Sequence, residues 1–171
     1  MLDPTLQMTR DYWLSIASPK PKLGEYILVY QLNKNKSFDK YAEEYAKRTG
    51  LRLCRLCFNY TQIRQSGKVI LLPQVKDFVS YIANARCVIT DSFHATAFCI
   101  NFNTPFISIY PNEFSSRIAG LLELTGLLDR RLIDFEDFSF IDKNIDFTSA
   151  NKILEKERLK AVDFLRNAIE E

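Results

Sequence analysis

The chain of 171 residues has the length of one domain with a sizeable hydrophobic core. Its 47% hydrophobic and 13% aromatic content excludes a disordered polymer. The formal net charge of +2, with basic and acidic residues interspersed, argues against a nucleic-acid-binding protein.

The sequence predicts neither an export signal nor a membrane-spanning stretch. No apolar run approaches the roughly 18 residues that cross a bilayer. Residues 1–4 lack the basic start and apolar continuation of a secretory signal. The four cysteines lie in or beside apolar segments, as reduced core thiols do. We therefore expect a cytoplasmic protein without a membrane span.

Residues 1–22 are interpreted as an entry helix and a linker. Thr9 stands where it can cap a short helix, and the Ser-Pro-Lys-Pro-Lys run at residues 18–22 interrupts the helical pattern. The remaining residues, 23–171, are expected to form a single domain.

Short apolar runs alternate with helical patterns along this domain. Strands are predicted at residues 26–30, 51–57, 69–72, 87–90 and 105–109. Helices are predicted over residues 37–50, 74–85, 94–102 and 115–126, and from residue 149 onward. This alternation predicts an α/β fold: a Rossmann-like, doubly wound and mostly parallel sheet. Segments 91–94 and 110–117 both follow strands, so both belong on the ligand-binding edge of that sheet.

The second predicted strand alternates apolar residues with Arg52 and Arg55, which favours a half-solvated strand at the edge of the sheet. Its Cys54 and Cys57 have CxxC spacing, but residues three apart in a strand point to opposite faces. We interpret both as core cysteines rather than as metal or redox ligands.

Motifs that would indicate a cofactor or a metal are missing from the sequence. It contains no GxGxxG, GxxxxGK[ST] or GxSxG segment. The single histidine argues against a zinc site, and the acidic cluster at residues 134–137 is typical of a solvated loop. We expect neither a cofactor nor a metal.

The most informative segment is Thr-Asp-Ser-Phe-His at residues 90–94, between a predicted strand and a predicted helix. Such a turn directs backbone N–H groups and the positive end of the helix dipole at one point, where anions bind. His94 can move protons near neutral pH, or its ring can simply be satisfied by a backbone carbonyl. Asp91 can orient His94 or cap the helix, and Ser92 can also serve as the cap.

Arg117 is the second candidate. It lies in the first turn of a predicted helix, where the helix dipole disfavours a cation, and such local conflicts are common at ligand sites. The guanidinium fork suits a phosphate or a carboxylate, but the position is at least as typical of a solvated arginine.

Four segments of the sequence match motifs of a known family. Two of them are Val-Ile-Thr-Asp-Ser-Phe-His-Ala-Thr-Ala-Phe at residues 88–98 and Asn-Thr-Pro-Phe at 103–106. They resemble the "ITDSFHGT" and "N-x-P-F" elements of the polysaccharide pyruvyl transferase family. Leu-Asp-Pro-Thr at 2–5 is similar to the segment that enters the family's C-terminal half, and Ser-Arg-Ile at 116–118 to its "SRI…LL" element. The likeness covers roughly residues 2 to 130.

The resemblance implies the C-terminal half of an enzyme with two Rossmann-like halves in a glycosyltransferase-B-like arrangement. Such an enzyme moves a pyruvyl group from phosphoenolpyruvate to sugar hydroxyls as a ketal, in exopolysaccharide or cell-surface glycan biosynthesis. The implied partners are phosphoenolpyruvate, a saccharide acceptor and an N-terminal domain that is missing from this chain. We therefore expect the chain to be a fragment that is inactive alone.

On this resemblance the catalytic residues are His94, as general acid, and Asp91, as the group that holds its imidazole. The expected substrate-binding residues are Ser92, Phe93, Ala95, Thr96, Ser116 and Arg117. Ala95 departs from the family's glycine: its methyl group perturbs the donor contact if a ligand approaches the backbone there, and is harmless if the residue packs in the helix.

Two other functions stay open at this stage. The first is a non-catalytic Rossmann-like module for ligand binding or subunit contact, which the missing half and Ala95 favour. The second is the C-terminal domain of a glycosyltransferase that uses a nucleotide sugar. The acceptor sugar, the ketal's position and the oligomeric state are not specified by the sequence.

Overall fold

The computed structural model describes residues 2–111 and 115–170, and it confirms the predicted fold class. The strands are β1 (Tyr26–Tyr30), β2 (Arg52–Cys57), β3 (Lys68–Leu71), β4 (Cys87–Thr90), β5 (Phe106–Ile109) and β6 (Arg131–Leu132). The α-helices are α1 (Pro4–Gln7), α2 (Arg10–Ile16), α3 (Lys36–Thr49), α4 (Val75–Ala83), α5 (Phe93–Phe102), α6 (Ser115–Thr125) and α7 (Thr148–Glu170). Short 3₁₀ turns are η1 (Tyr60–Arg64), η2 (Leu128–Arg130) and η3 (Ser139–Ile141).

Within the described residues the strands form one parallel sheet in the order β3-β2-β1-β4-β5-β6. This is the common strand order of dinucleotide-binding folds. The order reverses between β1 and β4, where Tyr30 lies opposite Thr90. Ligands of such sheets bind outside the carboxyl ends of the strands at this reversal.

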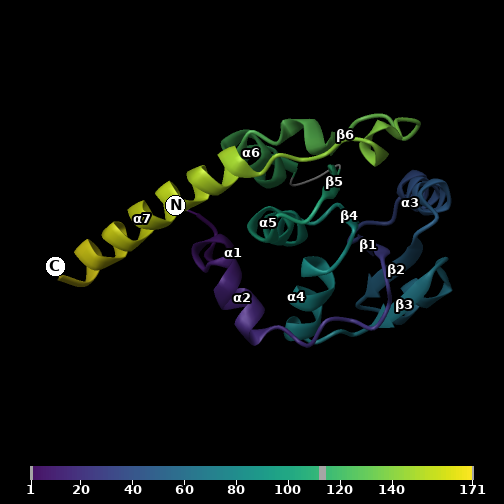
Figure 1. The fold of residues 1–171 in the computed structure, drawn as a ribbon, viewed down its shortest axis with the longest axis horizontal. Coiled ribbons are helices and arrows are strands. Elements are labelled where there is room, and N and C mark those ends of the chain that lie inside the picture. Colours follow the sequence, from purple (N-terminus) through teal and green to yellow (C-terminus); the bar gives the residue numbers. More distant parts are fainter. Residues whose placement is uncertain (1, 112–114, 171) are drawn as a thin grey trace.

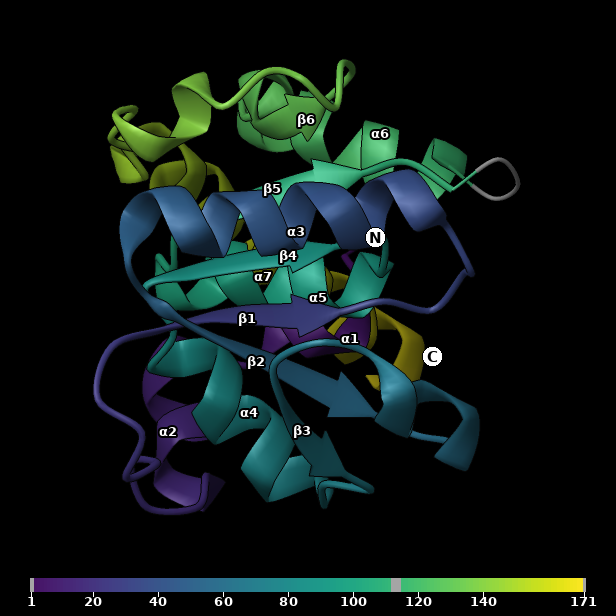
Figure 2. The same ribbon diagram turned by 90° about the vertical axis from the view of Figure 1, so that its right-hand side faces the viewer.

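Helices cover both faces of the sheet. Figure 1 shows α3 on one side of the strands and α4 and α5 on the other. Figure 2 shows α3 across the near face, with α4, α5 and α7 behind the sheet. The α3 face buries a cluster that includes Ile27, Ile89 and Ile107, joined by aromatic residues of segment 133–147. The opposite face buries a larger cluster under α1, α4, α5, α6 and α7.

The helix ends follow local sequence signals. Asn35 accepts hydrogen bonds from the N–H groups of residues 37 and 38 and so caps α3, which ends at Gly50 in the left-handed region (φ +68°). Thr9 caps α2, as predicted, by accepting from the N–H of Tyr12. Asn103 ends α5 at φ +58°, a conformation that asparagine tolerates better than most residues.

The prediction that residues 51–57 form an edge strand is wrong. β2 lies between β3 and β1, and Arg55 is only 1% exposed. Its Nη1 pairs with Asp39 of α3 at 3.1 Å, and its Nε donates to the carbonyl of Ser66 at 2.8 Å. The charged side chain of Arg55 is therefore buried because two other segments of the chain supply its partners. The alternating pattern of the strand itself contains no sign of these partners. Arg52, at the start of the strand, is exposed as expected.

The N-terminal segment packs into the core through Leu2 and Leu6. Arg158 of α7 fastens it: its Nε donates to the carbonyl of Leu6 and its Nη2 to Oδ1 of Asn101, both at 2.8 Å. Asn101 in turn donates to the carbonyl of Met8 at 3.0 Å. Across residues 2–111 and 115–170, every helix is either too short or too polar to cross a bilayer.

Candidate functional site

The candidate site lies at the carboxyl ends of β1, β4 and β5. The turn from β4 into α5 is formed by Asp91 and Ser92, and the loop from β1 into α3 runs beside it. The hydroxyl of Thr90 connects the end of β1 with this turn, because it donates to the carbonyl of Tyr30 at 2.6 Å and accepts from the N–H of Ser92 at 3.0 Å. Residues 112–114 of the predicted segment 110–117 lie outside the described part of the chain.

Asp91 joins the two loops rather than holding His94. Its Oδ1 accepts from the N–H of Leu32 at 2.7 Å, and its Oδ2 accepts from the backbone N–H and the side-chain amide of Asn33, both at 2.9 Å. Both carboxylate oxygens are therefore used by the β1–α3 loop. The capping role falls to Ser92, whose Oγ accepts from the N–H of Ala95 at 3.4 Å. Asp91 precedes that cap, so its side chain is directed back across the sheet to β1.

A small cavity of about 190 Å³ opens at this point of strand-order reversal. Asp91, Asn33 and Lys34 line one part of it, and Tyr110 lines another. The hydroxyl of Tyr110 is buried and has no hydrogen-bond partner among the described residues. Sequence reasoning placed Tyr110 on this edge but missed Asn33 and Lys34, for which the only available signal was their position directly after a predicted strand.

His94 is the second residue of α5, and it is exposed. Its ring meets that of Phe93 edge-on, with centroids 5.5 Å apart. The imidazole therefore lies in the first turn of a helix whose N-terminus carries the positive end of the dipole.

Arg117 approaches the same place from α6. Its guanidinium lies over the ring of Phe93 at 4.1 Å, and its Nη2 pairs with Oδ2 of Asp3 at 3.0 Å. The Arg117 side chain is 57% exposed, whereas that of Asp3 is 16% exposed. Phe93 thus contacts both the imidazole and the guanidinium and holds these two groups on one surface.

Asp3 is the acidic member of this cluster. Burial raises the pKa of its carboxyl group, but hydrogen bonds from the side chain and backbone of Thr5, together with the nearby charges of His94 and Arg117, outweigh that effect and lower the pKa. Asp3 is therefore a carboxylate at neutral pH. Sequence reasoning used Asp3 only as part of a family-like segment, because no local pattern connects it with residues 94 and 117.

The other predicted binding residues differ in their exposure to solvent. Ser116 is exposed beside Arg117. Ala95 and Thr96 are fully buried, and the Thr96 hydroxyl donates to the carbonyl of Ser92 at 2.9 Å. The methyl group of Ala95 belongs to the larger core cluster, which agrees with the helix-packing interpretation of this residue.

The CxxC pair is confirmed as two core thiols. Cys54 and Cys57 are free and buried, and burial raises the pKa of each. Cys54 packs in the larger core cluster, whereas the Cys57 thiol points at the carbonyl of Gln62.

Comparisons with known proteins identify the family of the chain. The family model described as "Polysaccharide pyruvyl transferase" matches residues 1–113. No curated protein matches the sequence. Among solved structures, the chain is similar to UDP-N-acetylglucosamine 2-epimerase from Rickettsia bellii, at 16% identity and a TM-score of 0.41. That match covers 95% of this chain and 50% of the epimerase chain, so the chain spans about half the length of that structure. Because the family model extends over 113 of the 171 residues, and these include Asp3 and His94, the chain belongs to the polysaccharide pyruvyl transferase family.

Proposed function

We propose that this chain is the C-terminal, donor-binding half of an enzyme that transfers a pyruvyl group from phosphoenolpyruvate to a saccharide as a ketal. The observation that carries the proposal is a cluster in which the ring of Phe93 contacts the exposed side chains of His94 and Arg117. Arg117 in turn pairs with the carboxylate of Asp3. The cluster combines a proton-transfer group with an anion-binding group at the carboxyl edge of the sheet.

The donor is a small anion with a phosphate and a carboxylate, so its binding requires concentrated positive charge. The first turn of α5 supplies the positive end of a helix dipole, and Arg117 supplies a planar fork that fits either anionic group. Arg117 uses one terminal nitrogen on Asp3, and its high exposure leaves the guanidinium accessible from solvent.

His94 is the proposed general acid. It gives a proton to the methylene carbon of phosphoenolpyruvate, which becomes a methyl group while positive charge develops on the adjacent carbon. A sugar hydroxyl adds to that carbon and loses its proton to a base. Phosphate then leaves with the electrons of its C–O bond, and a second sugar hydroxyl adds to the same carbon and gives its proton to the departing phosphate, which closes the ketal. We place the base in the N-terminal domain, together with part of the acceptor site.

We assign to Asp3 the role that the sequence analysis gave to Asp91, that of positioning His94. Its carboxylate lies within electrostatic reach of His94, whereas both oxygens of Asp91 are bonded to the β1–α3 loop. We therefore propose Asp3 as the residue that positions His94 and Arg117. Four free, buried thiols support the assignment of this activity to the reducing cytoplasm.

The donor site is tested by titrating the 171-residue chain with phosphoenolpyruvate while the His94 ring resonances are followed by NMR. We expect saturable shifts, and an affinity lowered about tenfold or more in Arg117→Gln, since a hydrogen bond to a charged group contributes roughly 1.5–3 kcal/mol. Arg166→Gln is the matched control, because Arg166 is also exposed and paired with a carboxylate but lies far along α7.

The same titration separates the alternatives. Displacement of phosphoenolpyruvate by uridine or cytidine diphosphate would favour a nucleotide-sugar transferase. Absence of any phosphoenolpyruvate-dependent shift would favour a non-catalytic module. In the full two-domain enzyme, His94→Ala is expected to abolish turnover while donor binding partly survives, and unchanged pyruvylation would refute the role of His94.

A further inference from the structure

A larger cavity opens at the amino ends of the strands, on the opposite side of the sheet from the strand ends near His94. Ile27, Cys87 and Phe106, which stand at the amino ends of their strands, form part of its wall. Its volume is about 670 Å³, within the range of small-molecule sites. The four residues of β4, at about 3.3 Å each, put roughly 13 Å of sheet between this cavity and the turn that carries His94.

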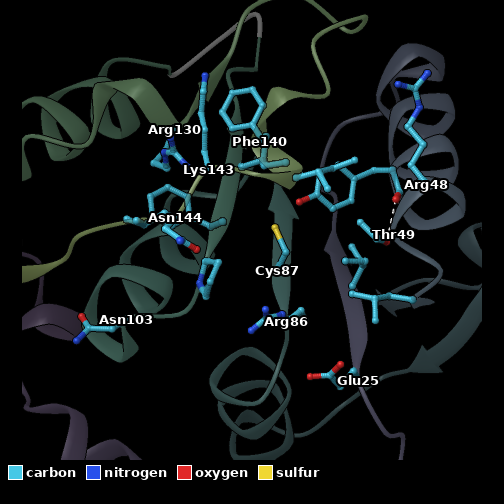
Figure 3. Close-up of a pocket in the computed structure, with 18 of the residues that line it drawn as sticks. Glu25, Arg48, Thr49, Arg86, Cys87, Asn103, Arg130, Phe140, Lys143 and Asn144 are labelled. Atoms are coloured by element: carbon cyan, nitrogen blue, oxygen red, sulfur yellow. Dashed lines mark hydrogen bonds between the residues drawn. The ribbon is translucent and has the colours of Figure 1, made fainter.

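Positive charge is concentrated around this cavity. The cavity is lined by Arg48 of α3, Arg86 before β4, Arg130 of η2 and Lys143, whereas Glu25 is the one carboxylate among the described residues of its wall. Figure 3 shows Arg130, Lys143 and Phe140 on one side and Arg48 and Thr49 on the other, with the sulfur of Cys87 between them. Four separate segments of the chain therefore bring cations to one opening.

Arg130 is the residue that points most directly to a ligand. Its side chain is only 3% exposed and pairs through Nη2 with Asp129. Its Nε is buried and has no hydrogen-bond partner among the described residues. A buried charged donor without a partner is costly. An anion in the cavity that Arg130 lines would supply the missing acceptor.

The remaining wall of the cavity is apolar or neutral. Phe106, Phe140 and Phe147 contribute buried aromatic rings. Burial raises the pKa of Cys87 to about 12, so this residue presents a neutral thiol rather than a thiolate. The cavity thus pairs a ring-lined interior with cationic side chains, a combination that suits an anion carried on an apolar, ring-sized body.

From the buried, unpartnered Nε of Arg130 in a basic, ring-lined cavity, we infer a second ligand site that binds an organic phosphate or carboxylate. It is separate from the proposed donor site and does not depend on it. Arg130 and Lys143 bind the anionic group, and the phenylalanine rings contact the apolar body.

The test uses phenyl phosphate as the probe, with phenol and inorganic phosphate as its neutral and its ring-free counterparts. In calorimetric titrations of the 171-residue chain, we expect phenyl phosphate to bind at least tenfold more tightly than either. Arg86→Gln and Lys143→Gln change exposed side chains, so folding is retained, and each is expected to weaken binding several-fold. Arg52→Gln is the matched control, since it removes the same charge from an exposed position outside the cavity.

Two results would overturn the inference: no detectable binding of phenyl phosphate, or equal binding by wild type and Lys143→Gln. Arg130→Gln is a second variant, checked for folding by its melting temperature, and it should bind most weakly of all. The combined His94→Ala and Arg117→Gln variant should bind phenyl phosphate normally. Loss of binding in that variant would assign the signal to the donor site and refute a second site.

Discussion

Replacing Asp91 by Asn should loosen the edge of the sheet on which the candidate site is built. The carboxylate is 4% exposed and accepts three hydrogen bonds of 2.7–2.9 Å from Leu32 and Asn33. An asparagine amide presents its NH₂ group to at least one of these donors. One hydrogen bond to a charged group is then lost, at roughly 1.5–3 kcal/mol, and the others weaken because their acceptor is neutral, so we expect a loss of about 2–4 kcal/mol in total.

In a domain of this size, each kcal/mol lowers the melting temperature by about 2–4 °C, so the variant should melt about 4–16 °C below wild type. Thermal denaturation measures this difference, and hydrogen exchange should accelerate at the amides of Leu32 and Asn33. Asp142→Asn, an exposed substitution of the same kind, should stay within about 0.5 kcal/mol of wild type. Equal melting of both variants, with slow exchange retained at the two amides, would refute the role given to Asp91.

Two further substitutions test the packing. Arg55→Met removes the charged partner of the Asp39 carboxylate. That carboxylate is 27% exposed and partly rehydrates, so we expect a loss near the lower end of the range for a broken buried pair, about 3 kcal/mol. Chemical denaturation measures this, and a loss no larger than that of the exposed Arg52→Met would contradict it. Ala95→Gly should cost about 1.5 kcal/mol, from helix propensity and one buried methyl group, without changing the affinity for phosphoenolpyruvate. A tenfold gain in that affinity would show instead that the methyl group obstructs the donor.

Local patterns predicted most of the regular structure. Strand β4 has the predicted bounds because a continuous apolar run ends at the polar turn of Asp91. Helix α3 ends at Gly50, as predicted, because glycine adopts the left-handed conformation without cost. The two-residue strand β6 was not predicted, since so short a strand carries no periodicity.

Tertiary pairing accounts for what the sequence did not reveal. Arg55 looked solvated because its partner, Asp39, lies 16 residues earlier on a different element. Asp91 binds a loop 58 and 59 residues away, which no motif around His94 encodes. Asp3 lies 114 residues from Arg117, so only the fold brings the carboxylate and the guanidinium together.

The hydrogen bond from Arg158 to the N-terminal segment also affects when this segment can fold during synthesis. Arg158 lies 152 residues after Leu6, whose carbonyl it binds. At about 5–20 residues per second, the ribosome needs roughly 8–30 seconds to make that span. During this interval Leu2 and Leu6 lack part of their cover, and the segment that carries Asp3 lacks the hydrogen bond from Arg158. The N-terminal side of the cluster around His94 is therefore completed only after α7 has been made, although Asp3 is among the first residues synthesised.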